Sequence, residues 1–524
     1  MDAFAVLIPL MPTIAALMIG TGHLFGAIKG EASESLTALT ASWAVSMSCL
    51  LALTLLGADL LDRNNGIFTL GLWLDSDKLD IVMNFITTGF GVKLAALFAV
   101  LLTVITRFSI NYMHREAGFH RFFFILSLFS AAIFMIVLSG NALGTFAGWE
   151  IAGLCSYLLI AYAYDRPIAA ANATRVFVTN RIGDAAFVLG IGLSYAWIES
   201  VNWLDMKAAV GELSRGENTA IALCFTVAAL AKSAQLPFSP WLARAMEGPT
   251  PSSAAFYGAV MVHAGVFLVI LLEPLISQSV LVRVLLIFSG LTTAITSYFA
   301  GLTQTDVKSS QVFATSGQLG LMFLACGLNF WQLASWHLCA HAVVRCYLLL
   351  TAPSFMVNVK DNPIKPVNLV LANNRWLFTT SLQRFWVEPI NEWALVKPIR
   401  RLAHDLSHFD DRVVDRFMGI PAPAIDVAST LAQLEERGLA ARIDNGLDIG
   451  KGTFVKDTGL LGTIVGWIIG LAHWFEERLI LQGVGKDALN LGRALGHLAN
   501  KLETSVLRPR YLVLLVFITL LVAS

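Results

Sequence analysis

A lysine, Lys232, lies near the end of the apolar run Ala220 to Leu236, and two prolines, Pro237 and Pro240, follow it closely. An ionisable side chain inside a membrane segment is costly unless it is paired or hydrated, so such residues mark ion or proton pathways. Irregular backbone at that depth is tolerated mainly where it lines a cavity or the protein interior. The combination predicts a functional site at a broken helix.

A glutamate, Glu150, lies in another apolar run, Leu143 to Ala163, and Lys232 is its expected counter-ion. Burial disfavours the charge on either side chain, whereas proximity favours both charges, so such a pair can exchange its protonation when distance or hydration changes. The pair therefore predicts a proton relay. The alternative is a static intramembrane salt bridge that only fixes the register of two helices.

The run Ala169 to Ile198 carries Arg175, Arg181 and Asp184. Arg181 and Asp184 are three positions apart, so they can meet on one face of a helix. Arginine stays charged in proteins and suits a fixed pair better than a proton carrier. We include Arg175, Arg181 and Asp184 in the predicted proton relay, where Asp184 can tune Lys232 or Glu150 through space. The alternative is a fixed pair.

Two histidines and an arginine, His337, His341 and Arg345, follow one another at intervals of four, which places them on one stripe of a helix. Histidine titrates nearest neutral pH, so the stripe favours a stepwise proton path. No carboxylate or thiolate completes a ligand motif, and we predict no metal site. The alternative is a pair of core histidines bonded to neighbouring helices.

Two further titratable residues belong to the same set. His263 lies inside the apolar run Ser253 to Leu272, and its role is open. Lys308 lies at the boundary between two apolar runs, where a lysine can extend the relay or simply reach the membrane interface with its amine.

The composition requires a membrane setting for these residues. Hydrophobic residues make up 56% of the 524 residues and charged residues 14%, with a mean hydropathy of +0.69. Soluble domains carry about a quarter charged residues, so most of this surface must face lipid. The net charge is zero and basic residues alternate with acidic ones, which excludes a nucleic-acid partner. We expect an integral protein of the bacterial inner (cytoplasmic) membrane.

Apolar runs long enough to cross a bilayer predict an all-α polytopic protein. Eleven precede residue 354, and they are Phe4 to Ile28, Leu36 to Leu56, Ile86 to Ile105, Phe122 to Leu138, Leu143 to Ala163, Ala169 to Ile198, Ala220 to Leu236, Ser253 to Leu272, Leu285 to Leu302, Val312 to Leu328 and Trp331 to Pro353. Two more, Thr458 to Phe475 and the shorter Tyr511 to Ala523, bring the expected number to twelve or thirteen.

The residues that could do chemistry resemble ordered motifs of the antiporter-like subunits of respiratory complex I, especially subunit L. The similar stretches are Tyr112-Met-His-Arg-Glu-Ala-Gly-Phe-His-Arg-Phe-Phe123, Gly148-Trp-Glu-Ile-Ala-Gly-Leu-Cys-Ser-Tyr-Leu-Leu159, Arg181-Ile-Gly-Asp184, Lys232-Ser-Ala-Gln-Leu-Pro237, Gly248-Pro-Thr-Pro-Ser-Ser253, Gln304-Thr-Asp-Val-Lys308 and His337-Leu-Cys-Ala-His341. The same family includes large subunits of multisubunit sodium/proton antiporters and membrane subunits that energise inorganic-carbon uptake.

This resemblance implies two inverted five-helix repeats, each with a broken helix, joined by a hydrated polar axis. It implies that Glu150 and Lys232 form the coupling pair, and that Asp184, Lys308, His337 and His341 surround and extend it. The expected regions are N-terminal helices (1–110), a first repeat with a broken seventh helix (111–279), a truncated second repeat (280–353), an amphipathic membrane-parallel arm (354–457) and C-terminal membrane segments (458–524).

The sequence departs from the family pattern in three places. Four residues after Ser253 the family has a histidine, whereas this chain has Tyr257 and places His263 six residues later. The family's lysine four residues beyond His341 is Arg345, a poor proton donor. After Pro353 no second broken helix with its own buried lysine follows, and the segments Phe385-Trp-Val-Glu-Pro-Ile390 and Phe409-Asp-Asp-Arg-Val-Val-Asp-Arg416 resemble the membrane-parallel part of subunit L.

These observations leave three functions open. The chain can be a proton-translocating membrane subunit of a complex I-like energy-coupling complex, the energising subunit of a bicarbonate or CO2 uptake complex, or a structural anchor without proton conduction. Its partners are other subunits, lipid and protons, with sodium as an alternative ion. We expect no catalytic centre in the chain itself, and no flavin, iron–sulfur, quinone or nicotinamide motif predicts a cofactor.

Overall fold

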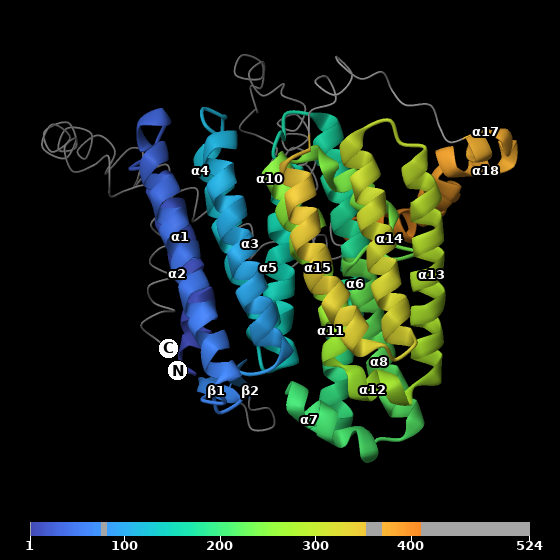
Figure 1. Ribbon diagram of the computed structural model, residues 1–524, viewed down its shortest axis with the longest axis horizontal. Coiled ribbons are helices and arrows are strands. Elements are labelled where there is room, and N and C mark those ends of the chain that lie inside the picture. Colours follow the sequence, from blue (N-terminus) through green and yellow to red (C-terminus); the bar gives the residue numbers. More distant parts are fainter. Residues whose placement is uncertain (1, 75–80, 353–368, 410–524) are drawn as a thin grey trace, which may run out of the picture. The chain divides into compact units, whose positions relative to one another are not determined.

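The structure is a computed structural model, and it describes residues 2–74, 81–352 and 369–409. The chain divides into two compact units, Met1–Val396 and Lys397–Ser524. The described part of the second unit is one helix, α20 (Lys397–Phe409). All the candidate residues lie in the first unit, whose long helices run side by side (Figure 1).

Long helices make up most of the first unit. They are α1 (Phe4–Leu24), α2 (Glu34–Leu60), α3 (Phe90–Tyr112), α4 (Phe119–Leu138), α5 (Ala142–Ile160), α6 (Pro167–Ile198), α8 (Arg215–Lys232), α13 (Val280–Leu302), α14 (Val307–Gly327) and α15 (Trp331–Leu350). Shorter helices connect them, namely η1 (Glu31–Ser33), α7 (Trp203–Ala208), η2 (Ala209–Gly211), α9 (Pro240–Arg244), η3 (Ala245–Glu247), α10 (Thr250–Ser253), η4 (Ala254–Ala259), η5 (Met261–His263), α11 (Ala264–Leu271) and α12 (Glu273–Gln278).

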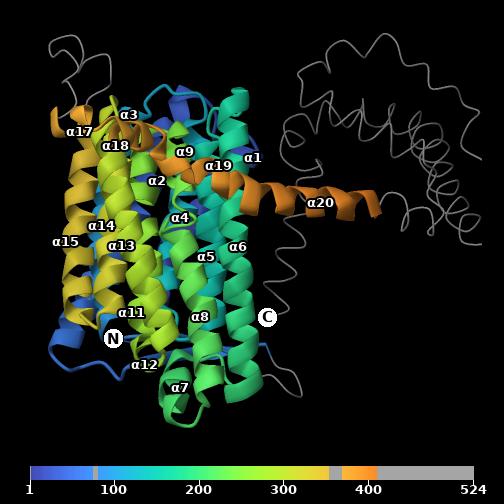
Figure 2. The same ribbon diagram turned by 90° about the vertical axis from the view of Figure 1, so that its right-hand side faces the viewer.

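The last described part of the first unit is a chain of short helices, which we call the arm segment. It comprises α17 (Leu369–Asn373), α18 (Arg375–Leu382), η6 (Arg384–Trp386), α19 (Val387–Asn391) and η7 (Glu392–Val396). Figure 2 shows this segment running across the long helices rather than along them. The division between the two units falls inside the expected arm, 354–457.

The expected membrane helices are present. Each of the eleven runs expected before residue 354 coincides with a helix or a chain of helical pieces, and nine of these helices, within the described residues, are long and apolar enough to cross a bilayer. Of the other two, α8 carries Arg215, Glu217 and Lys232, and α14 is diluted by serines and glutamines. The runs Thr458 to Phe475 and Tyr511 to Ala523 lie outside the described residues.

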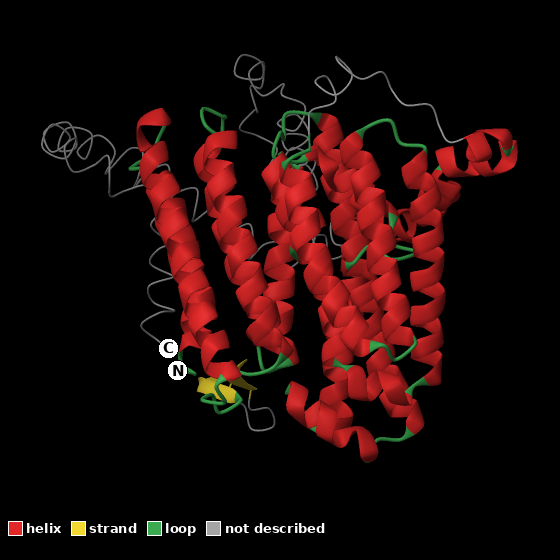
Figure 3. Cartoon of the chain, viewed as in Figure 1, coloured by secondary structure: helices red, strands yellow, loops and turns green. Residues whose placement is uncertain are grey.

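The chain is a mostly helical polytopic membrane protein, as expected, and it also contains a β-hairpin that was not expected. Strands β1 (Ile67–Leu74) and β2 (Ile81–Ile86) pair antiparallel at one end of the helices (Figure 3). Aromatic and β-branched residues favour strands where the chain leaves the membrane. The Asn141 amide donates to the carbonyl of Val82 at 2.8 Å, which ties the hairpin to the start of α5.

The eighth run is continuous in the sequence but segmented in space. Between α10 and α11 the backbone passes through a π-helical piece, η4, and a 3-10 piece, η5. Nearly all side chains of this segment are buried. Insertions of π-helix change the phase of a helix and are frequent at functional sites, and this segment determines which way His263 points.

Candidate functional site

Lys232 is the last residue of α8, and it is enclosed completely, with 1% of its surface exposed. Its amine donates a hydrogen bond to the backbone carbonyl of Trp149 at 2.9 Å and lies 5.0 Å from the centre of the Trp149 ring. No described carboxylate lies within ion-pair distance of this amine. Lys232 is therefore a buried amine held by neutral partners.

The carboxylates near Lys232 belong to a network centred on Arg181. The Arg181 guanidinium contacts Glu150 at 2.5 Å and Asp184 at 2.9 Å. The second oxygen of Asp184 accepts a hydrogen bond from the indole of Trp149 at 2.9 Å. Trp149 thus bonds both Asp184, through its ring, and Lys232, through its backbone.

The contact expected between Arg181 and Asp184 is confirmed, whereas the partner expected for Glu150 was wrong. Glu150 pairs with Arg181 and makes no ion pair with Lys232 in the described structure. A permanently charged, planar guanidinium binds two carboxylates at once, which a compact ammonium at the end of α8 does less well. The roles assigned to these residues remain predictions.

A small pocket lies beside the two cations. It is lined by Gly153, Arg181 and Lys232, and by the polar side chains of Ser156 and Asn180. A β-carbon added to Gly153 would lie 3.3 Å from the Lys232 amine and 3.5 Å from the guanidinium of Arg181. The absence of a side chain at residue 153 therefore leaves room for the Lys232 amine beside Arg181.

The broken helix predicted at Pro237 and Pro240 is confirmed. After α8 the chain turns through Ala234, whose φ is +50°, and helix resumes as α9 at Pro240. Side chains from other helices satisfy the freed backbone groups: Thr293 accepts from the amide of Leu236, and Ser289 donates to its carbonyl. A break at this depth requires such partners because lipid offers none.

A second cluster forms where α15 meets the segmented helix. His263, which is fully buried, lies with its Nε2 2.8 Å from Nδ1 of His341. The Arg345 guanidinium donates from Nε to Nε2 of His341 at 3.2 Å. His337 is one turn away, with its ring centre 6.1 Å from that of His341, and bonds Gln318 at 2.8 Å.

Two candidates lie apart from both clusters. Lys308, in the first turn of α14, donates to the hydroxyl of Thr250 at 2.5 Å and touches neither Lys232 nor the histidines in the described structure. Arg175 lies on α6 and pairs with Glu392 of the arm segment at 3.8 Å. Both connect the ends of helices.

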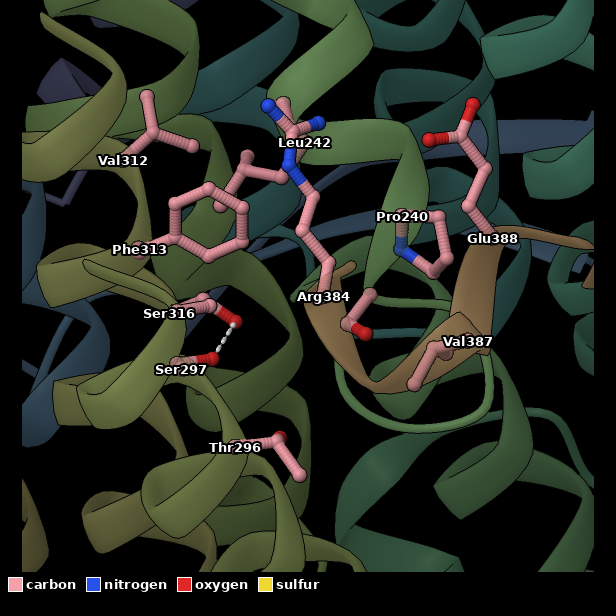
Figure 4. A pocket seen from close by; sticks show the side chains of 13 residues that line it. Pro240, Leu242, Thr296, Ser297, Val312, Phe313, Ser316, Arg384, Val387 and Glu388 are labelled. Atoms are coloured by element: carbon pink, nitrogen blue, oxygen red, sulfur yellow. Dashed lines mark hydrogen bonds between the residues drawn. The ribbon is translucent and has the colours of Figure 1, made fainter. Parts of the chain in front are cut away.

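The arm segment contacts the broken helix at Pro237 and at Arg244. Glu388 forms an ion pair with Arg244 at the end of α9, and the Asn391 amide donates to the carbonyl of Pro237 at 3.1 Å. Between this segment and α9, α13 and α14 lies a pocket, which is lined by Arg384, Ser297 and Ser316 (Figure 4).

Sequence reasoning missed Trp149, Gly153, Glu388 and Asn391. Trp149 and Gly153 flank Glu150 within one motif, and their positions one before and three after it are the available signal. The arm residues carried no such signal, because their partners are far away in the sequence. Within the described residues, no group of three or more histidines, cysteines or carboxylates is placed to hold a metal ion.

Two family models match the chain. Residues 139–373 match "NADH:quinone oxidoreductase/Mrp antiporter, TM", and residues 73–123 match "NADH-Ubiquinone oxidoreductase (complex I), chain 5 N-terminus". Between them these matches contain every candidate residue.

Similar proteins are known from chloroplasts and bacteria. The chloroplastic NAD(P)H-quinone oxidoreductase subunit 5 of Zygnema circumcarinatum is 33% identical over 374 residues, covering 69% of this chain and 53% of the relative. NADH-quinone oxidoreductase subunit L of Rhodobacter capsulatus is 37% identical over 306 residues, covering 54% and 42%. The chain thus spans about half the length of these relatives.

The fold is shared with a chain of the Mrp complex from a Dietzia species, with a TM-score of 0.58 at 22% identity, covering 65% of this chain and 37% of that one. The ordered motifs, the family matches and this fold agree. The chain is an integral membrane protein that belongs to the antiporter-like subunit family of complex I and Mrp complexes.

Proposed function

We propose that this chain translocates protons as the membrane subunit of a multi-subunit energy-coupling complex, and that Lys232 is the group that gains and loses the proton. The observation that supports this most directly is the amine of Lys232, which is buried and, among the described residues, hydrogen-bonded to a neutral carbonyl. A lysine in such surroundings shifts between charged and neutral forms more readily than a salt-bridged one.

The arrangement favours a relay over a static anchor. An anchor would pair Lys232 with a carboxylate, as buried charges are normally paired. Here Glu150 and Asp184 both form ion pairs with Arg181, so Lys232 can change its charge without breaking an ion pair. The pocket beside Gly153, between Arg181 and Lys232, is about the size of a single water molecule.

The proposed path has two parts. Glu150, Arg181, Asp184 and Lys232 form the coupling part, and His263, His341 and His337 form a second part. No described side chain bonds one part to the other, so water must complete the connection. We also propose that the second repeat is truncated after residue 353, so that a partner subunit completes the transmembrane path.

The relatives described above are subunits of oxidoreductase or Mrp complexes, and we propose a complex of this kind, in a bacterial inner membrane, for this chain. Nothing in these relatives specifically supports the inorganic-carbon alternative. Co-purification distinguishes the two. Redox or antiporter-like subunits would support the proposal, and a zinc-dependent soluble partner would support carbon uptake.

The central test compares Lys232→Ala, Lys232→Arg and Glu150→Gln in the assembled complex. Coupled activity should be lost in all three, including Lys232→Arg, because arginine keeps the charge but does not release a proton at neutral pH. Lys93→Ala, at an exposed lysine of α3, is the matched control and should behave as wild type. Full coupled activity in assembled Lys232→Ala would refute the relay.

The same preparation separates protons from sodium. Coupled activity that persists in sodium-free buffer supports protons, which carboxylate, lysine and histidine side chains carry. A strict sodium requirement would contradict the proposal.

A further inference from the structure

The second cluster has a feature that the proposed relay does not explain, namely the direction of its hydrogen bonds. Arg345 is a permanent donor, and it donates to Nε2 of His341 at 3.2 Å. A ring nitrogen that accepts a hydrogen bond carries no proton. His341 is therefore neutral, with its proton on Nδ1.

That assignment fixes the next bond. Nδ1 of His341 lies 2.8 Å from Nε2 of His263, and one of these nitrogens must donate. Because His341 carries its proton on Nδ1, it is the donor and His263 is the acceptor. His263 is then neutral as well, with its proton on Nδ1. Arg345, His341 and His263 thus form a row of hydrogen bonds in which each residue donates to the next, from Arg345 toward His263.

The row also lacks a counter-charge. Within the described part of the chain, no carboxylate lies within ion-pair distance of Arg345, whose surface is 9% exposed. Arg181, in contrast, contacts two carboxylates. A neutral imidazole holds a guanidinium more weakly than a carboxylate does, so Arg345 can leave His341 more easily than Arg181 can leave its partners.

We propose that Arg345 controls proton movement through His337, His341 and His263, which we call the histidine branch, and thus acts as its gate. A proton passing through His341 must occupy Nε2, the atom that Arg345 covers, so the branch is closed while the guanidinium is docked. When the guanidinium turns toward a better acceptor, Nε2 becomes free and the branch opens. This inference rests on the proton relay proposed above and adds the residue that controls one branch of it.

The first test reads the tautomers directly, by 15N NMR of histidine side chains in the full-length protein in lipid bilayers. Wild-type His341 should show an unprotonated Nε2, identified by the signal that is lost in His341→Gln. In Arg345→Met this fixed state should be lost, whereas Arg345→Lys, which keeps a donor, should preserve it. His120 is the internal control, because its Nε2 faces the carbonyl of Gly30 at 3.2 Å and should stay protonated in every variant.

The second test measures passive proton leak through the complex in proteoliposomes. Arg345→Met should raise the leak severalfold, and adding His341→Gln to it should return the leak to the wild-type level. An unchanged tautomer or an unchanged leak in Arg345→Met would overturn the gate. If Lys232→Ala loses coupled activity in that case, the relay stands and only the gate fails. If Lys232→Ala keeps it, the relay fails whatever the tautomers show.

Discussion

The two polar clusters of this chain each contain an arginine, but the arginines have opposite surroundings. Arg181 lies between two carboxylates and makes ion pairs with both, while Arg345 lies against the imidazole of His341 with no described carboxylate in reach. Arginine therefore offsets the negative charge of carboxylates in the Arg181 cluster, whereas it adds a positive charge without a described counter-ion in the Arg345 cluster. The difference shows that the chemistry of a polar membrane cluster depends on how its charges are balanced, more than on which residues titrate.

In the Arg181 cluster, both carboxylates contact the guanidinium, so Lys232 can change its protonation without breaking an ion pair. In the Arg345 cluster, an unbalanced charge keeps the neighbouring histidines neutral and ordered. Substitutions that alter the charges or hydrogen bonds of one cluster at a time test this difference.

The largest effect is expected from Arg181→Met, which leaves Glu150 and Asp184 without their cation. Breaking a fully buried pair costs about 3–5 kcal/mol, and we expect about 2 kcal/mol because the Arg181 side chain is 33% exposed. Thermal unfolding of the purified protein measures it. Adding Asp184→Asn should recover part of the loss, and wild-type stability of Arg181→Met would contradict the central role of Arg181.

The next largest effect is expected at Trp149, whose buried indole donates a hydrogen bond to a charged partner, whereas the buried indole of Trp203 donates to a neutral one. Trp149 donates to the Asp184 carboxylate at 2.9 Å, and Trp203 donates to the hydroxyl of Thr145 at 3.1 Å. Hydrogen bonds to charged groups contribute about 1.5–3 kcal/mol and neutral ones about 0.5–1.5. Trp149→Phe should therefore destabilise more than Trp203→Phe in thermal unfolding, and equal losses would show that the Asp184 charge is not stabilised there.

The arm segment should affect only the cluster that it braces. Asn391→Ala removes the bond to the Pro237 carbonyl, at a cost of about 1 kcal/mol, and should speed hydrogen exchange of residues 233–239 and lower coupled activity. The His341 tautomer should not change, because no described contact joins the arm segment to His341. A changed tautomer would show that the two clusters are mechanically linked.

The smallest effect is expected from Gly153→Ala. The added carbon would lie within 3.5 Å of both cations, and the flexible amine of Lys232 can move aside at little cost. We expect assembly to be normal and coupled activity to fall modestly. Gly192→Ala on α6 is the control, since a β-carbon there meets nothing within 4 Å. A larger loss in the control would exclude crowding at Lys232 as the cause.

Much of this architecture could be predicted from the sequence, because hydropathy reports membrane helices and prolines report a break. Lys232 was found for the same reason, since a charge inside an apolar run is conspicuous. The partner of Glu150 could not be predicted, because it depends on how α5 and α6 rotate against each other. The approach of His263 to His341 depends on the π-helical piece Ala254–Ala259, which shifts the helix phase without a sequence mark.

The hairpin and the arm segment show the same limit at longer range. Strands β1 and β2 occupy a stretch that was expected to be a connection between membrane helices. The arm contacts join residues 144 and 154 positions apart. Such pairings depend on the folded backbone, and neither composition nor spacing reveals them.

The contacts of Glu388 and Asn391 also constrain the order in which the protein can be made. A ribosome completes the lysine-bearing helix and its break long before it reaches the residues that clamp them. During that interval the nascent chain holds Lys232 in the bilayer beside an unbraced turn. The turn at Pro237 and the helix that follows it therefore gain these two contacts only after residues 388 and 391 have been made.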